Sequence, residues 1–172
     1  SVTRSSYPKH KQCNSFEILK KLKLQGKIKH IAMSFHDTAD VLDMILTEQK
    51  DIEVVQLQIN YLDYDDPAVQ SKACYDVAVK HGKKVIVMEP VKGGALVNLP
   101  AEAAAEFAVL SDAAPVSSAL RYAASFPEVF MVLSGMGNTD MMQDNINSFM
   151  DSKPLSEEEL RATDRAREII RE

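Results

Sequence analysis

The chain has 172 residues, of which 45% are hydrophobic and 26% are charged, an ordinary composition for one globular domain with a core of its own. Its net charge of −5 argues against a general nucleic-acid or anionic-membrane surface, so an anionic ligand would have to be held locally by a few lysines and backbone N–H groups. No apolar stretch approaches membrane-spanning length, and no segment is typical of a signal peptide. Cys13 and Cys74 fit no metal or redox spacing, so we expect reduced thiols, a cytoplasmic location and no metal site.

The N-terminal part of the chain is predicted to contain an arm and one helix. Residues 1–14 are polar and without a periodic pattern, and we expect a loose arm or connection there. A helix is predicted from Ser15, because the apolar residues that follow share one face and Gly26 can end it. Since the first residue is Ser1 and not Met, we expect a processed chain or a fragment.

Strands and helices then alternate along the chain. Runs of β-forming residues predict strands at 31–35, 54–59, 84–88 and 129–135. Apolar periodicity with capping residues predicts helices at about 37–49, 66–82, 101–109 and 115–125. A further helix is predicted from Thr139, with an apolar face made of Met142, Ile146, Phe149 and Met150. A capping box of Ser156 and Glu159 starts the last helix, in residues 155–172, which we expect to pack across the end of the domain.

This alternation predicts an α/β fold with a parallel sheet and right-handed crossovers. The strands are apolar on both faces, as expected of parallel strands that are covered by helices. Two architectures fit, an open doubly wound sheet and part of a (β/α)8 barrel. A complete barrel needs about 200 residues or more, so the chain has the material for half of one.

The ends of the third and fourth predicted strands resemble phosphate-binding loops. In a parallel sheet, functional residues collect at the C-terminal ends of the strands. The third strand ends at Met88 and leads through Pro90 into Lys92-Gly93-Gly94, and the fourth leads into the glycine-rich segment 134–138. Glycine loops, a lysine and a helix N-terminus supply converging N–H donors and positive charge, which favours a phosphate site. Alternatively, each loop is only a tight turn or makes space for a helix.

The first two strand ends carry polar residues with two open interpretations. Gln56 and Gln58 share a strand face, where they form either a polar layer inside a barrel or amides that orient a ligand. Ser34 has the same two interpretations. His36 is either a catalytic acid or base, or a residue at the rim beside Asp37, which can cap the next helix.

Four segments in register resemble the aldo/keto reductase family. They are GKIKHIAMSFHD, VVQLQINYLDYDD, GKKVIVMEPVKGGAL and VLSGMGNTDMMQDNI. They are similar to the fifth to eighth strands of that family's barrel with their loops, and the SFHD and MEPVKGG variants resemble a bacterial branch that often carries a C-terminal iron–sulfur domain. The resemblance implies that residues 15–154 form a parallel (β/α) half-barrel, the second half of a TIM (β/α)8 barrel, which binds NADPH or NADH.

The resemblance also implies roles for individual residues. Ser34 and Gln56 match the residues that hold the nicotinamide carboxamide, and Met88 stands where many members stack an aromatic ring on the nicotinamide. The loop along the pyrophosphate is matched by Pro90, Lys92, Gly93, Gly94 and Leu96. The residues near the adenosine and its adenine side are matched by Gly135, Met136, Asn138, Asp144 and Asn145.

Three of the family's features are absent from the sequence. The family's catalytic tyrosine, lysine, aspartate and histidine come from the first half of the barrel, so we assign no catalytic residue. Neither Arg nor Lys lies between Gly135 and Asn145, where NADPH-preferring members often place one for the 2′-phosphate. The cysteines of the iron–sulfur domain are missing too.

Three functional hypotheses follow. In the first, the parent protein is an NAD(P)H-dependent oxidoreductase that interconverts small carbonyl compounds and alcohols, and this chain is a truncated fragment that is inactive alone. In the second, the chain is a non-catalytic nucleotide-binding or assembly module, and two copies close one barrel through their exposed edges. In the third, the chain belongs to another phosphate-binding barrel enzyme, for instance one that acts on a sugar phosphate.

Overall fold

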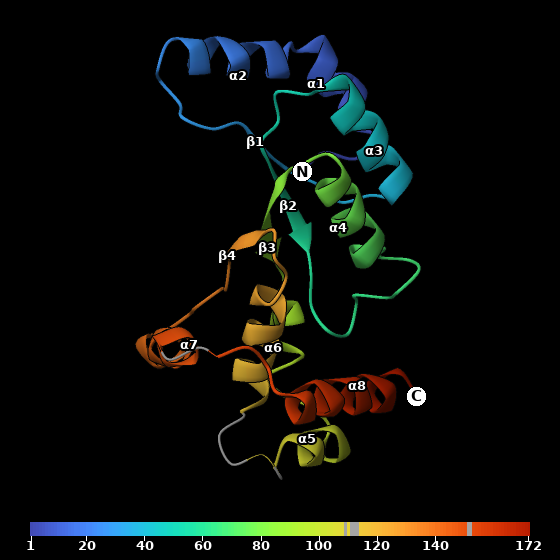
Figure 1. Ribbon diagram of the computed structural model, residues 1–172, viewed down its shortest axis with the longest axis vertical. Helices are drawn as coiled ribbons and strands as arrows, with labels where there is room; N and C mark the ends of the chain where they lie inside the picture. Colours follow the sequence, from blue (N-terminus) through green and yellow to red (C-terminus); the bar gives the residue numbers. More distant parts are fainter. Residues whose placement is uncertain (109, 111–113, 151–152) are drawn as a thin grey trace.

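The computed structural model describes residues 1–108, 110, 114–150 and 153–172, and shows an α/β fold around a parallel four-stranded sheet of order β1-β2-β3-β4 (Figure 1). The strands are β1 (Ala32–Ser34), β2 (Val54–Gln58), β3 (Lys84–Met88) and β4 (Val129–Val132). The helices are α1 (Tyr7–Gln12), α2 (Ser15–Leu24), α3 (Ala39–Glu48), α4 (Ser71–Lys80), the short 3-10 helix η1 (Lys92–Gly94), α5 (Ala101–Ala108), α6 (Pro115–Ala124), α7 (Thr139–Met150) and α8 (Glu157–Arg171).

The two faces of the sheet differ in their burial. Successive strand residues point to opposite faces. On one face, Val55 of β2 and Val87 of β3 are fully buried in the main core, against residues of α3 and α4. On the other face, Gln56, Ile86 and Met88 are only half-buried. Full burial on both faces was expected, but within the described residues it holds for one face only, and there only along β1, β2 and β3.

The N-terminal segment is more ordered than the loose arm that the sequence suggested. The backbone of Val2 forms a parallel bridge beside β1, donating to the Ser34 carbonyl at 2.7 Å and accepting from the His36 N–H at 3.2 Å. Tyr7 at the start of α1 is 2% exposed and donates from its hydroxyl to Glu48 at 2.7 Å. A single bridge and a six-residue helix are too short to give a periodic pattern, so sequence analysis missed them.

Two element boundaries differ from the predictions by three residues or more. Helix α4 begins at Ser71 and not at Asp66. The Asp66 carboxylate instead accepts from the N–H groups of Ala68 at 2.7 Å and Val69 at 3.3 Å, so Asp66-Pro67 forms a separate turn before the helix. Strand β4 ends at Val132, three residues before the predicted end. Residue 109, the last of the helix expected at 101–109, lies outside the described residues.

The C-terminal helix begins as predicted. The Ser156 hydroxyl accepts from the Glu159 N–H at 3.1 Å, and the Glu159 carboxylate accepts from the Ser156 N–H at 2.8 Å, which confirms the capping box. Helix α8 lies beside α5 (Figure 1). Its inner residues join a second hydrophobic cluster around Tyr61, Leu96 and Phe107.

Helix α7 lies apart from α5 and α8 (Figure 1). The apolar face predicted for it is exposed to solvent: Met142 is 45%, Ile146 42%, Phe149 38% and Met150 72% exposed. The sequence pattern identified the shared face correctly, but periodicity does not say what covers such a face.

None of the helices in the described ranges has both the length and the apolar composition that a bilayer crossing requires.

Candidate functional site

Three predicted site residues meet on the half-buried face of the sheet. Ser34 of β1, Gln56 of β2 and Met88 of β3 stand on neighbouring strands. The Ser34 hydroxyl lies 4.0 Å from the Met88 sulfur, and the Gln56 amide nitrogen lies 3.2 Å from it. Because a thioether is a weak acceptor, both donors remain available to a stronger acceptor such as a ligand carbonyl.

A pocket of about 400 Å³ lies between the loops that follow β3 and β4. Its walls come from the segment after β3, from α6, from the segment after β4 and from α7. The lining residues are Glu89, Pro90, Val91, Gly93, Gly94, Val97, Val116, Leu133, Ser134, Gly135, Met141, Asp144 and Asn145. Six predicted site residues are therefore brought together in this pocket, namely Pro90, Gly93, Gly94, Gly135, Asp144 and Asn145.

Two asparagines fix the wall that α7 contributes. Asn138 accepts a hydrogen bond from the Met141 N–H at 2.9 Å and so caps the first turn of α7. Asn145 donates to the Ser134 hydroxyl at 2.9 Å and so ties α7 to the segment after β4. The predicted site residues Asn138 and Met136 do not line the pocket, and Met136 is 48% exposed.

The glycine pair after β3 is required by backbone conformation. Gly93 has a φ of +61° and Gly94 a φ of +96°, which L-residues with a side chain rarely adopt. A Cβ atom at Gly93 would come no closer than 3.9 Å to Glu89, and one at Gly94 would meet no atom within 4 Å. The space in front of both glycines is open, so the loop presents bare backbone to the pocket.

The other two predicted residues of this loop point away from the pocket. Leu96 is 0% exposed and packs in the second hydrophobic cluster, so its side chain anchors the loop from behind. Lys92 forms an ion pair with Asp63, whose side chain is 2% exposed. The structure therefore assigns these two side chains to the support of the loop in this conformation.

A sequence profile of the aldo/keto reductase family matches residues 5–168 of this chain. The chain belongs to the aldo/keto reductase family. A search of curated protein sequences found no match.

Solved aldo/keto reductase structures share the fold. The chain superposes on an aldo-keto reductase from Bacillus halodurans, in its holo form, with a TM-score of 0.68 and 22% identity, over 88% of this chain and 54% of the other. It superposes on an aldo/keto reductase from Klebsiella pneumoniae, solved in complex with NADP and acetate, with a TM-score of 0.63 and 18% identity, over 87% and 52% of the two chains. The chain thus spans about half the length of these structures.

The sequence analysis missed two residues behind the loop of this aldo/keto reductase chain. Asn60 and Asp63 follow β2 and are both buried, and they contact the segment that follows β3. Their signal in the sequence was an asparagine directly after a strand with an aspartate three residues later, a spacing typical of side chains that bond to their own turn.

Negative charge dominates the pocket. Glu89 and Asp144 both line it, and neither Lys nor Arg is among the described residues that do. Such a pocket opposes additional negative charge on any molecule that enters it.

Proposed function

We propose that the chain is the cofactor-binding half of an NAD(P)H-dependent oxidoreductase, equivalent to strands five to eight of a TIM barrel. The proposal rests on one observation: the same sheet carries both a cluster of polar contacts and a pocket. The contacts between Ser34, Gln56 and Met88 lie on one face of the sheet, and the pocket of about 400 Å³ lies at the ends of β3 and β4. Family membership and a coverage of 54% of a neighbour's length support the half-barrel.

The proposed roles follow from the chemistry of each group. Ser34 and Gln56 hold the nicotinamide carboxamide, and Met88 supports the nicotinamide ring through its polarizable sulfur. The backbone of Gly93 and Gly94 lies along the pyrophosphate, in the segment that also includes Pro90, Lys92 and Leu96. The adenosine side is assigned to Gly135, Met136, Asn138, Asp144 and Asn145. The cofactor, when bound, supplies a hydride for a small-molecule carbonyl substrate.

The catalytic acid and its neighbours are assigned to the other half of the barrel. The chain alone is therefore expected to bind the cofactor without turnover. Both cysteines are free thiols, which fits a reducing cytoplasm. Membership of the aldo/keto reductase family favours a dinucleotide over a sugar phosphate as the phosphate-bearing ligand.

Calorimetric titration of NADH and of NADPH into the purified chain tests the cofactor proposal. We expect saturable binding at one site per chain, with NADH bound at least as tightly as NADPH, because Glu89 and Asp144 oppose the charge of a 2′-phosphate. Gly94→Val is the matched variant, since a β-branched residue cannot adopt a φ of +96° without strain. Absence of binding by either dinucleotide would contradict the proposal, and much tighter NADPH binding would contradict the charge argument.

Exposed apolar side chains near the C-terminal strand favour a second candidate function. Nine exposed large apolar side chains lie between residues 130 and 150, on β4, the segment after it and α7. They are Phe130, Met131, Leu133, Met136, Met141, Met142, Ile146, Phe149 and Met150. Strand β4 is also an edge of the sheet. An exposed apolar patch on an edge strand is typical of an interface.

In this second function the chain is an assembly module, and two copies close one barrel-like dimer. The two-fold arrangement would place β4 of one copy beside the edge of the other copy at which Val2 bridges β1. Light scattering across a range of concentrations should then show a mass that rises toward that of a dimer. A strictly monomeric mass at high concentration excludes this function and leaves the cofactor proposal untouched.

A further inference from the structure

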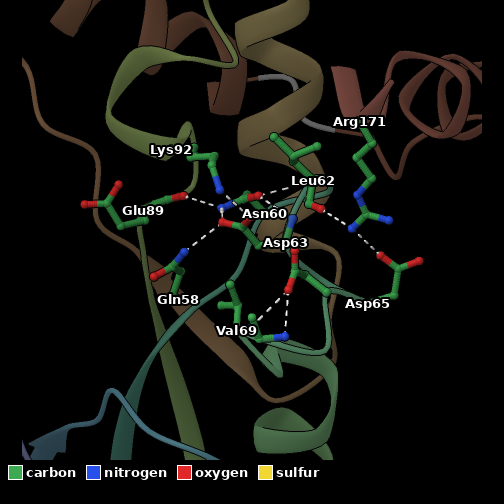
Figure 2. A network of polar contacts seen from close by, with 11 residues as sticks. Gln58, Asn60, Leu62, Asp63, Asp65, Val69, Glu89, Lys92 and Arg171 are labelled. Carbon is green, nitrogen blue, oxygen red and sulfur yellow. Dashed lines mark hydrogen bonds and ion pairs between the residues drawn. The ribbon is translucent and has the colours of Figure 1, made fainter. Parts of the chain in front are cut away.

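A buried carboxylate lies directly behind the glycine loop. Asp63 is 2% exposed and accepts hydrogen bonds from the Gln58 amide at 2.7 Å and from the Asn60 amide at 3.0 Å. Its third partner is the ammonium group of Lys92, which points toward it in Figure 2. Burial by itself would raise the pKa of Asp63, but the hydrogen bonds from Lys92, Asn60 and Gln58 and the charge of Lys92 outweigh it and lower the pKa.

Asn60 attaches the same turn to the start of the loop. Its side-chain oxygen accepts from the N–H groups of Leu62 at 3.1 Å and Asp63 at 2.9 Å, which fixes the turn after β2. Its amide nitrogen also donates to the Glu89 carbonyl at 3.0 Å. The turn therefore holds the loop at two points that are three residues apart, Glu89 through Asn60 and Lys92 through Asp63.

These two attachment points are the strained residues of the loop. Glu89 has a φ of +56° and Lys92 a φ of +47°, beside the two glycines at +61° and +96°. Glycine adopts this left-handed region freely, whereas a residue with a side chain does so only when its surroundings hold it there. The contacts from Asn60 and Asp63 fall on the two residues that need such support.

Lys92 cannot leave Asp63 without a large cost. Among the described residues, Lys92 is the only cation that contacts this carboxylate. Its departure would leave a buried negative charge with only two amide donors, which is strongly unfavourable. In addition, Lys92 is absent from the lining of the pocket.

We propose that Asp63 is a positioning residue for the dinucleotide loop. With Asn60 and Lys92 it forms a latch that keeps Glu89 and Lys92 in the left-handed region, so that Gly93 and Gly94 face the pocket. Lys92 contributes to ligand binding through this latch, and its ammonium group stays with Asp63 when a pyrophosphate is bound. The inference rests on the proposed function for its ligand, but the latch itself is a property of the free chain.

Hydrogen–deuterium exchange on the ligand-free chain tests the latch. Asp63→Asn removes the charge and turns one oxygen into an NH2 group that faces a donor in either orientation, the Lys92 ammonium or the amides of Gln58 and Asn60. Amides in peptides covering 89–97 should therefore exchange about 10- to 100-fold faster. Asp65→Asn is the matched control: it removes the same charge from the same turn, but its partners are Arg167 and Arg171 on α8. Exchange in 89–97 should not change in this control. Unchanged exchange in Asp63→Asn would overturn the proposal, whether or not a dinucleotide binds.

Affinity measurements separate the latch from direct contact by Lys92. If Lys92 binds the pyrophosphate directly, Asp63→Asn frees it and should tighten the binding of NADH and of inorganic pyrophosphate. The latch predicts the opposite, a loss of about tenfold or more for NADH in Asp63→Asn and in Lys92→Met. The double variant Asp63→Asn/Lys92→Met removes both charges and should bind no worse than Lys92→Met alone. Tighter binding in Asp63→Asn would overturn the proposal.

The double variant Asp63→Asn/Lys92→Met also serves as a control for a folding defect in Lys92→Met. Lys92→Met alone leaves a buried carboxylate unpaired, whereas the double variant contains no buried charge at this site. If the wild-type chain binds neither dinucleotide, the proposed function fails, and the exchange rates in 89–97 still decide for or against the latch.

Discussion

Leu96→Ala is expected to lower the free energy of unfolding by about 2–5 kcal/mol, the usual range for truncating a fully buried leucine. Leu96 is 0% exposed and packs with Tyr61 and Phe107 in the second hydrophobic cluster. It stands two residues after Gly94, so the cavity left by the substitution lies directly behind the glycine loop. The loss should therefore appear in stability and, through a looser loop, in dinucleotide affinity.

Val97→Ala is the matched control for this prediction. Val97 is the next residue in the chain, but it is 42% exposed and lines the pocket. Its truncation should cost less than about 1 kcal/mol of stability, because little buried apolar area is lost. Urea unfolding of both variants makes the comparison. Similar losses from the two truncations would show that Leu96 is not an anchor of the loop.

Arg121→Ala is expected to cost about 3–5 kcal/mol, the range for removing one partner of a buried ion pair. Arg121 on α6 and Glu159 on α8 form a two-pronged pair whose side chains are 14% and 12% exposed. The guanidinium also donates to the carbonyl oxygens of Lys153 at 3.0 Å and Pro154 at 3.2 Å. One side chain thus joins α6 to both the start of α8 and the segment before it.

The large loss of stability expected for Arg121→Ala comes from Glu159, which would lose its cationic partner. Burial alone would raise the pKa of the Glu159 carboxyl, but the hydrogen bonds from Arg121 and from the Ser156 N–H outweigh it and lower the pKa. Without Arg121 this carboxylate keeps only the backbone donor of Ser156. The capping box that it shares with Ser156 should then loosen, and amide exchange in α8 should rise.

Arg161→Ala serves as the control for Arg121→Ala. Arg161 pairs with Glu157 on the same helix, but these side chains are 67% and 86% exposed. An exposed pair contributes at most about 1 kcal/mol, so this variant should unfold at nearly the wild-type urea concentration. If Arg121→Ala behaves like Arg161→Ala, the pair between α6 and α8 has no structural role.

The elements of the fold could be predicted wherever the signal was local and long enough. The strand at 84–88 was predicted with the bounds observed for β3, and α2 begins at Ser15 as predicted. The capping box of Ser156 and Glu159 is a contact across three residues, so the sequence contains the whole motif. Short elements gave no clear periodicity: α1 has only six residues, and its segment was predicted to be a loose arm.

The candidate site was predictable in its composition, but the orientation of its side chains was not. The glycine pair and its neighbours at the ends of β3 and β4 do meet in one pocket. Lys92 was predicted to supply positive charge to a phosphate, whereas its ammonium group is paired with Asp63, 29 residues earlier in the chain. Leu96 was read as part of the site, whereas it is buried behind it.

The sequence by itself determined the alternation of strands and helices, the parallel sheet and the position of the glycine loop. These features depend on periodicity, capping and turn chemistry, which act within a few residues. Only the tertiary structure decided which side of the loop faces the pocket, which carboxylate holds Lys92, and which face of α7 stays exposed. Those outcomes depend on contacts between segments that are distant in the chain, and such contacts form only when the sheet brings the ends of its strands together.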